Sequence, residues 1–285
     1  NTVLVKGDIG DAVALADIGW VKGGSVNNPD GVKGAYDSWT NHGVTVLVDH
    51  HVTVESSNAL SLATLSPPSG FKIDGGWDVS SVGDVNSDGF DDFSVNAGSS
   101  YIVYGAANGL GDIDLATFTA GDGFVISRNV PGDGSGLNAQ SAGDVNGDGI
   151  DDLVVGARSA DTANGADSGE TYVIYGKEGG PGNIDVATLS ASEGFKISGE
   201  AAGDASGGAV SSAGDFNGDG IDDLIVGAPH ADPGGRYDSG TSYVIYGHAG
   251  GSGDIDLAAL TPSLGFKFFG PYSFQSYSGG SVTSA

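Results

Sequence analysis

The sequence contains no cysteine, so disulfides contribute nothing to its stability. This absence does not exclude secretion, because calcium ions can staple loops where disulfides are missing. Basic residues are scarce: 10 Lys and Arg against 37 Asp and Glu give a formal net charge of −27. We therefore expect no nucleic-acid partner, since phosphate binding requires clustered Lys and Arg.

Long hydrophobic runs are also missing, and none approaches the roughly 18 apolar residues of a membrane span. No signal peptide is visible, and the first residue is Asn1, so we expect a processed form or an internal piece of a longer protein. Proline is low at 9 residues, whereas glycine reaches 52 of 285. This composition is typical of short strands joined by tight turns, in one large all-β domain or two smaller ones.

Catalytic signatures are missing as well. The sequence has no G-x-S-x-G, no H-E-x-x-H, no phosphate loop and no cysteine nucleophile. The acidic pair Asp112 and Asp114 is interpreted as a turn or a cap, because such pairs commonly serve turns. We expect the chain not to be an enzyme.

One pattern occurs three times, at residues 83–97, 143–157 and 214–228. Each copy contains D-x-N-x-D-G-x-x-D followed by a β-rich apolar run such as D-D-L-V-V-G-A. Positions 1, 3, 5 and 9 of the loop carry side-chain oxygens, and position 7 is apolar. In order of position, these residues are Asp84, Asn86, Asp88, Phe90 and Asp92; Asp144, Asn146, Asp148, Ile150 and Asp152; and Asp215, Asn217, Asp219, Ile221 and Asp223.

This spacing indicates a calcium-binding β-hairpin. Calcium takes six to eight oxygen ligands, and the glycine at position 6 permits the tight curl that brings them together. The position 7 side chain can anchor in a core while its carbonyl faces the metal. An EF-hand is not indicated, because position 12 is Val95, Val155 or Val226 and not Glu. The alternative is an Asp- and Gly-rich turn without metal; the threefold recurrence favours three calcium sites.

From about residue 57 the chain is periodic. G-F-K-I or a variant begins at Gly70, Gly123, Gly194 and Gly265, and a phrase such as S-Y-V-I-Y-G follows each calcium loop. The loop after the third strand is 11 residues shorter in the first repeat than in the other two. The two longer loops are expected to be surface excursions, where function often gathers.

Each repeat then supplies four strands, which predicts the blades of a β-propeller. We assign three complete blades and a partial fourth to residues 66–118, 119–189, 190–260 and 261–285. In this assignment G-F-K-I opens each blade. The tail G-F-K-F-F-G begins the fourth blade, which has two strands and no calcium loop.

Residues 1–56 lack the repeat and form a separate β-rich module, ahead of the propeller at 57–285. Strands are expected at residues 2–6, 12–16, 20–22, 34–39, 44–49 and 51–55. His50 and His51 would point to opposite faces of a strand, so no two-histidine metal site is expected. Trp20 and Trp39 are interpreted as core residues. The G-D-x-G-D-x-V-x-L, G-W and T-V-L-V-D pieces resemble a small β module of very large secreted bacterial surface proteins.

The G-F-K-I phrase, the D-x-N-x-D-G-x-x-D loop and L-I-V-G-A-P together resemble FG-GAP repeats. These are the blades of the integrin α-subunit propeller and of many secreted bacterial proteins. The resemblance implies calcium at the three loops, with the position 7 carbonyl as a ligand. Because integrin propellers have seven blades, it leaves ring closure within this chain open.

Three functions agree with these observations. The first, which we favour, is a calcium-stabilised extracellular or cell-surface structural or adhesive module. Its copies would assemble head to tail into a filament or a surface layer, with the N-terminal segment of one copy packing on the C-terminal half-blade of the next. The second is a lectin-like or protein-binding propeller with an extracellular ligand. The third is a non-catalytic accessory domain of a secreted hydrolase.

Overall fold

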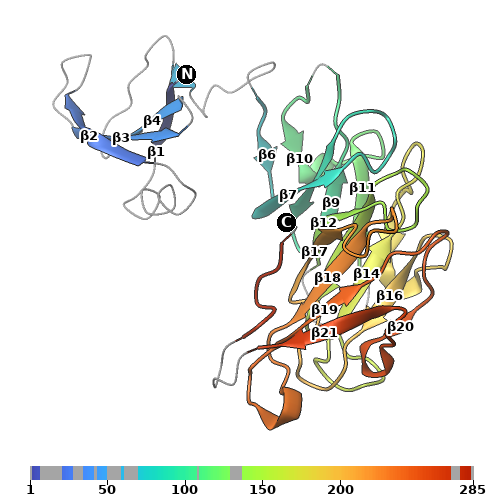
Figure 1. Ribbon diagram of the computed structural model, residues 1–285. Helices are drawn as coiled ribbons and strands as arrows, with labels where there is room; N and C mark the ends of the chain where they lie inside the picture. Colours follow the sequence, from blue (N-terminus) through green and yellow to red (C-terminus); the bar gives the residue numbers. More distant parts are fainter. Residues whose placement is uncertain are drawn as a thin grey trace. The chain divides into compact units, whose positions relative to one another are not determined.

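The computed structural model describes residues 70–107, 109–128, 137–270 and 277–283, and the backbone of five strands before them. These strands are β1 (Thr2–Lys6), β2 (Val21–Asn27), β3 (Ala35–Asn41), β4 (Val44–Asp49) and β5 (Ala59–Leu60). The chain forms two compact units (Figure 1): residues 1–72 with 108–112, and residues 73–107 with 113–285.

The first unit contains a mixed five-stranded sheet in the order β2-β3-β4-β1-β5. β3 pairs antiparallel with β2 and β4, whereas β1 pairs parallel with β4 and β5. β1 and β4 match the expected strands, and β2 and β3 overlap theirs. The strands expected at 12–16 and 51–55, and the side chains of Trp20, Trp39, His50 and His51, lie outside the described residues.

The described residues of the second unit form three sheets, each built on four antiparallel strands, which confirms the all-β, propeller-type architecture. The first sheet consists of β7 (Asp78–Gly83), β8 (Asp92–Asn96), β9 (Ser100–Val103) and β11 (Gly123–Ser127). The second consists of β12 (Asn138–Gly143), β13 (Asp152–Ala157), β14 (Glu170–Ile174) and β16 (Gly194–Ser198). The third consists of β17 (Ala209–Gly214), β18 (Asp223–Ala228), β19 (Thr241–Ile245) and β21 (Gly265–Phe269).

Short parallel strands link one sheet to the next. β15 (Ile184–Asp185) adds to β11 of the first sheet, and β20 (Ile255–Asp256) adds to β16 of the second. The matching strand β10 (Ile113–Asp114) pairs with β6 (Ile73–Asp74). Within the described residues, β21 of the third sheet has no such fifth strand.

The G-F-K-I strand lies elsewhere than expected. It does not open its own blade but forms the outermost strand of the preceding sheet, where β11 pairs with β9, β16 with β14 and β21 with β19. The connection turns back on itself, because the amide of Tyr104 bonds the carbonyl of Asp122, and Tyr175 bonds Glu193 likewise. The tail strand therefore completes the third sheet and starts no fourth one; in residues 277–283 only Ser278 forms a β-bridge, to Gly240.

Two hydrophobic cores lie between successive sheets, as the apolar alternation predicts. The first core combines five residues of the first sheet and its acidic loop with residues of the second sheet and its connections. The five are Val82, Val85, Ile102, Phe124 and Ile126, and the others are Leu137, Ala139, Leu153, Val155, Ala157, Ala160, Tyr172, Ile174, Ile184 and Val186. The second core, between the second and third sheets, contains Phe195, Ile197, Val210, Leu224 and Tyr243 among others. The second sheet is thus buried on both faces.

Short 3₁₀ helices follow the linking strands: η2 (Leu115–Thr117), η3 (Val186–Thr188) and η5 (Leu257–Ala259), with η4 (Pro233–Gly235) in a loop of the third repeat. Asp114 caps η2 by accepting from the amide of Ala116, as expected for a cap. None of the described helices is long and apolar enough to cross a membrane.

The two inter-sheet cores predict a contrast between matched phenylalanines. Phe195 is 4% exposed between two sheets, whereas Phe266, at the same position of the third sheet, is 36% exposed. Phe195→Ala should lower the free energy of unfolding by about 3–5 kcal/mol, and Phe266→Ala by clearly less. Urea unfolding of both variants in dilute solution measures the difference, and equal losses would contradict this account of the cores.

Candidate metal centre

The three acidic loops join the first and second strands of each sheet. Since β7 pairs antiparallel with β8, β12 with β13 and β17 with β18, each loop closes a β-hairpin, as predicted. The residue at loop position 9 is also the first residue of the second strand. The sheets therefore hold the two ends of every loop in the same relative position.

In the first loop, the side chain of position 1 organises the curl. The Asp84 carboxylate accepts hydrogen bonds from the amides of Asp88 (3.0 Å) and Gly89 (2.8 Å). Gly89 has a φ of 89°, the left-handed region that favours glycine. The carboxylates of Asp144 and Asp215 accept the equivalent hydrogen bonds in the other two loops, so the chain curls in the same way three times.

Positions 3 and 5 face the same point. The Asn86 side-chain oxygen accepts from the Asp88 amide at 2.9 Å, and the Asn86 amide group donates to the Asp88 carboxylate at 2.9 Å. The oxygens of positions 1 and 3 therefore converge on one backbone amide. Asn217 and Asp219 repeat both contacts in the third loop, whereas in the second loop the Asn146 amide group turns to Asp152 instead.

The aspartate at position 9 is buried in every copy. Asp92, 1% exposed, accepts from the amides of Val85 (3.1 Å) and Gly105 (2.7 Å), which ties the loop to the end of the third strand. Burial raises the pKa of Asp92 to about 6 and that of Asp152 to about 7, against backbone hydrogen bonds that lower them. Burial also raises the pKa of Asp223.

Position 7 behaves differently among the copies. Ile150 and Ile221 are half-buried, and Ile221 lies beside Gly147 of the preceding loop. Phe90 is 40% exposed, so the expected anchoring in a core is wrong for the first copy. The difference arises because the described residues hold no earlier acidic loop for Phe90 to pack against.

Position 8 has a role that our sequence analysis did not assign. Asp151 accepts from the amide of Asp84 at 2.9 Å, and Asp222 accepts from the amide of Asp144 at 3.0 Å. Each carboxylate thus joins its own loop to the loop of the preceding sheet. All three copies have aspartate at both position 8 and position 9, and this repeated pair was the sequence signal that could have revealed the contact.

The donor set suits a hard cation, because carboxylate and amide oxygens are the ligands that calcium prefers. In the structure these oxygens accept hydrogen bonds from the backbone of their own loop. Among the described residues, no group of three or more His, Cys, Asp or Glu side chains is arranged to hold a metal.

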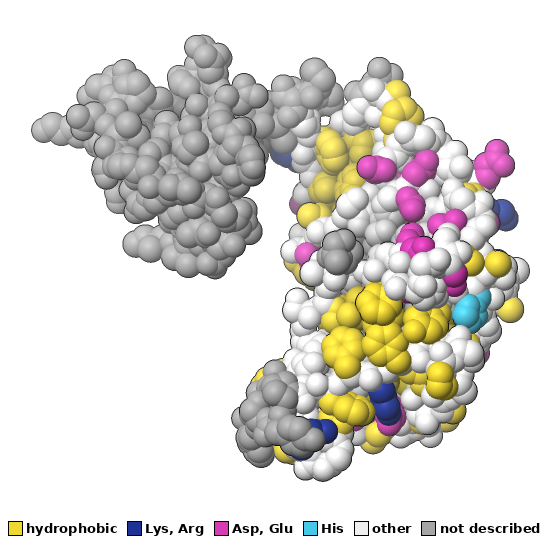
Figure 2. Space-filling model, viewed as in Figure 1, with side chains coloured by type: hydrophobic (Ala, Val, Ile, Leu, Met, Phe, Trp, Pro, Cys, Tyr) yellow, Lys and Arg dark blue, Asp and Glu magenta, His cyan; other side chains and the backbone are white. Residues whose placement is uncertain are grey.

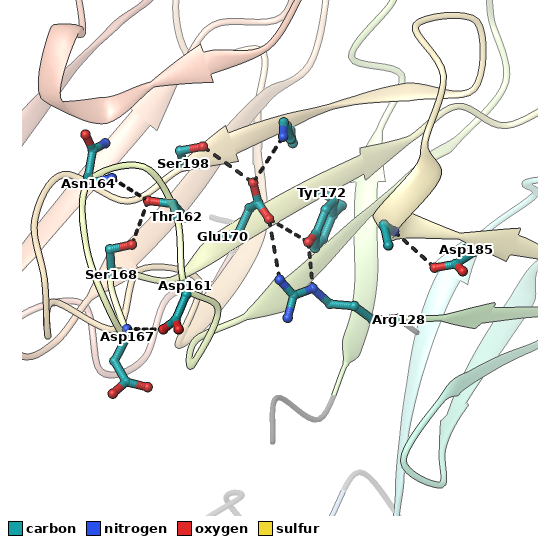
Figure 3. A network of polar contacts seen from close by, with 12 residues as sticks. Arg128, Asp161, Thr162, Asn164, Asp167, Ser168, Glu170, Tyr172, Asp185 and Ser198 are labelled. Carbon is teal, nitrogen blue, oxygen red and sulfur yellow. Dashed lines mark hydrogen bonds and ion pairs between the residues drawn. The ribbon is translucent and has the colours of Figure 1, made fainter. Parts of the chain in front are cut away.

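A separate polar network joins the end of β11, in the first sheet, to the second sheet (Figure 3). Glu170 is buried and contacts Arg128 at 3.8 Å and the hydroxyl of Tyr172 at 2.6 Å, and Arg128 Nε donates to the same hydroxyl at 2.8 Å. Lys196 lies 3.7 Å from Glu170 but is about half exposed. Burial raises the pKa of Tyr172, and the hydrogen bond to Glu170 raises it further.

Next to this network, the long loop between β13 and β14 is held by its own polar side chains. Asp161 accepts from the amide of Asp167, and the Thr162 hydroxyl bonds Ser168 at 2.7 Å. Asn164 donates to Asp256 of the following repeat at 2.8 Å. The loop is therefore an ordered excursion that contacts the next repeat.

Comparison with known proteins identifies the repeats. Residues 140–174 and 206–245 match the family model described as FG-GAP repeat. The chain is 34% identical over 187 residues to phosphatidylinositol-glycan-specific phospholipase D of Mus musculus, in a match that covers 61% of the chain and 20% of that protein. The same protein of Homo sapiens is 31% identical over 173 residues, covering 56% and 19%.

Integrin alpha-PS2 of Drosophila melanogaster is 37% identical over 109 residues, covering 36% of the chain and 7% of the integrin. The chain carries FG-GAP repeats, and its repeat region is related to segments of these proteins. It spans about a fifth or less of their length. The bacterial type and the identity of the N-terminal module stay predictions.

The raised pKa values of the buried aspartates predict how the metal-free protein responds to pH. For Asp92 and Asp152 the folded-state pKa, about 6 and about 7, lies above the unfolded value of 3.8. Burial therefore favours the protonated form, and stability is lost as pH rises through about 6 to 7. Melting temperatures in chelator should fall from pH 4 to pH 8, and Asp152→Asn should flatten this slope; a flat wild-type profile would contradict it.

Removing one partner of the buried ion pair should be costly. Arg128→Met leaves the Glu170 charge buried without its guanidinium, and the free energy of unfolding should fall by about 3–5 kcal/mol. The control Lys196→Met removes a half-exposed cation from the same carboxylate and should cost about 1 kcal/mol or less. Urea unfolding at pH 7 compares the two, and the double variant Arg128→Met with Glu170→Gln should recover part of the loss.

Proposed function

We propose that this FG-GAP repeat chain binds calcium at its three acidic hairpin loops and acts as a non-catalytic, calcium-stabilised extracellular structural or adhesive module. The observation that carries the proposal is the threefold recurrence of one loop geometry. In every copy, oxygens from positions 1 and 3 converge on the amide of position 5, and position 9 lies buried beneath them. An Asp- and Gly-rich turn without metal would not require the same arrangement of oxygens in three separate hairpins.

The ion would be held by the side-chain oxygens at positions 1, 3, 5 and 9 and by the carbonyl at position 7. In the first loop these residues are Asp84, Asn86, Asp88, Asp92 and Phe90. When bound, calcium supplies positive charge beside a buried aspartate whose ionisation burial disfavours. Three ions would bring the formal charge of the chain from −27 to −21, so it would remain strongly acidic.

An extracellular setting supports such sites. Extracellular calcium modules bind with dissociation constants of about 10⁻⁴ to 10⁻³ M, which only a calcium-rich medium fills. The related integrin segment agrees with this setting. Head-to-tail joining of copies is part of the proposed structural role.

Two other roles rest on specific observations. The similarity to segments of phosphatidylinositol-glycan-specific phospholipase D favours an accessory module of a secreted hydrolase. A hollow of about 290 Å³, lined by Glu200, Asp204, Asp232, Lys267 and Phe269, favours a ligand-binding propeller, because it combines an aromatic ring with convergent polar groups. Screening the chain against a glycan array would support the ligand-binding role if Phe269→Ala abolished a specific signal.

Calcium titration tests the main proposal. Metal-stripped protein should take up three calcium ions per chain by isothermal titration calorimetry, and excess calcium should raise the melting temperature by mass action. Asp148→Ala should remove one of the three sites. Asp161→Ala, an aspartate outside the acidic loops, serves as the control and should keep all three, whereas no calcium uptake by the wild type would refute the proposal.

A further inference from the structure

A hollow lies at the end of the second sheet that carries its acidic loop. Its volume is about 660 Å³, within the range of about 300–1,000 Å³ that small-molecule sites occupy. Asp148 of the acidic loop lines one side of it. Tyr175, Lys177 and Glu193 also line it, and they lie on the connection that leads from β14 to β16.

The repeats on both sides of the second sheet contribute to this hollow. The Lys177 amide donates to the Val85 carbonyl at 3.0 Å, which holds the connection on the acidic loop of the first repeat. Gly250, in the equivalent connection of the third repeat, lines the hollow, and its amide donates to the Asn146 carbonyl at 2.7 Å. The second sheet therefore has a neighbouring repeat on each side of the hollow.

Short turns fix the polar side chains that line the hollow. The Gly180 amide donates to the Lys177 carbonyl at 2.7 Å, and the Glu193 amide donates to the Ser190 carbonyl at 2.9 Å. The Tyr175 amide donates to the Glu193 carbonyl at 2.8 Å, which joins the two turns. Because these walls are ordered in advance, a ligand would lose less free energy to ordering the site when it binds.

Two groups of opposite charge line the hollow and keep hydrogen-bonding capacity. Glu193 Oε2 accepts from the hydroxyl (2.6 Å) and the amide (3.0 Å) of Ser190, whereas Oε1 accepts no hydrogen bond from the described residues. The Ser190 bonds lower the pKa of Glu193 and the Lys177 charge lowers it further, so this carboxylate is ionised at neutral pH. Within the described part of the chain, the Lys177 ammonium group forms no hydrogen bond and no ion pair.

Tyr175 adds an aromatic ring to the same hollow. The ring is half-buried and packs on Phe195 with a centroid distance of 6.2 Å. Its hydroxyl donates to the Ser252 carbonyl of the third repeat at 3.4 Å. Ligand sites typically combine such aromatic surface with a few fixed polar groups.

The pair of Lys177 and Glu193 occurs in one of the three repeats. At the equivalent positions, the first repeat has Ala106 with Asp122, and the third has His248 with Leu264. A pair that the repeat fold itself required would be expected in every copy, as the acidic loops are. The pair therefore indicates a role that belongs to this hollow.

The charges around the hollow select against ionic ligands. Glu193 and Asp148 disfavour an anion, and Figure 2 shows acidic side chains gathered on one face of the molecule with few Lys and Arg among them. Lys177 disfavours a cation. A hydroxyl group both donates and accepts hydrogen bonds, so a neutral ligand rich in hydroxyl groups can satisfy the ammonium group and the free carboxylate oxygen together.

We propose that this hollow binds a neutral saccharide. Lys177 donates to one hydroxyl of the sugar, Glu193 Oε1 accepts from another, and the Tyr175 ring packs against the apolar C–H groups of the sugar ring. The inference goes beyond the calcium-stabilised role, and it concerns a site separate from the smaller hollow that Phe269 lines. Lys177 and Glu193 lie outside the acidic loops, so the site does not depend on their side chains holding calcium.

Titration of the full chain with maltose, cellobiose, lactose and chitobiose, followed by ligand-observed NMR, tests the proposal. At least one of these neutral disaccharides should bind saturably. Lys177→Met and Glu193→Gln should each weaken this binding about tenfold or more, because each removes a hydrogen bond to a charged group. Two controls should bind like the wild type: Asp122→Asn, the counterpart of Glu193 in the first repeat, and Phe269→Ala in the smaller hollow.

Several results would overturn the proposal. These are no saturable binding of any of the disaccharides, equal binding by the wild type and both hollow variants, or loss of binding in Phe269→Ala alone. Binding of free lysine or glutamate in place of the disaccharides would show an ion site and would also contradict it. Lys177→Met and Glu193→Gln should keep the circular dichroism and the calcium uptake of the wild type, so the outcome is separate from that of the calcium titration.

Discussion

A four-stranded sheet with apolar side chains on both faces has to be covered twice, and this requirement governs the whole second unit. The second sheet meets it by packing one face on the first sheet and the other on the third. Each large apolar side chain that is buried there contributes about 1.5–3 kcal/mol. The linking strands, the loop bonds between Asp151 and Asp84, and the ordered excursion at Asn164 all join neighbouring repeats in the same direction along the chain.

In each repeat, one buried aspartate, at position 9 of the acidic loop, lowers the stability that this packing provides. The sheets bury the aspartate at position 9, and the curl of the loop brings further carboxylates near it, so that burial and repulsion both disfavour its ionised form. Backbone amides at both ends of the hairpin compensate part of this cost. The same arrangement that makes the loop unfavourable without a counter-ion makes it a suitable place for one.

The sequence was sufficient to predict the repeated four-stranded sheets, the hairpin position of the loops and the short first repeat, because these depend on local patterns with regular spacing. It was not sufficient to assign the G-F-K-I strand to its sheet. The sequence pattern suggests that this strand pairs with the strands that follow it in its own repeat. In the structure, the hydrogen bond from the Tyr104 amide to the Asp122 carbonyl turns the chain back, so that the strand pairs with the preceding sheet. The ion pair of Arg128 and Glu170 was also missed, since a buried charge pair leaves no periodic signal.

Because each sheet receives its outermost strand from the next repeat, the unit that recurs in the sequence is not the unit that folds. During synthesis, a sheet cannot be completed until the ribosome has passed the first strand of the following repeat, so the repeats become stable in order from the N-terminus. Gene duplication at the sequence boundary would always leave a sheet without its last strand. A boundary placed after Ser198 instead cuts between complete four-stranded sheets, and the pairing that it removes from the second sheet is the short one between β16 and the linking strand β20.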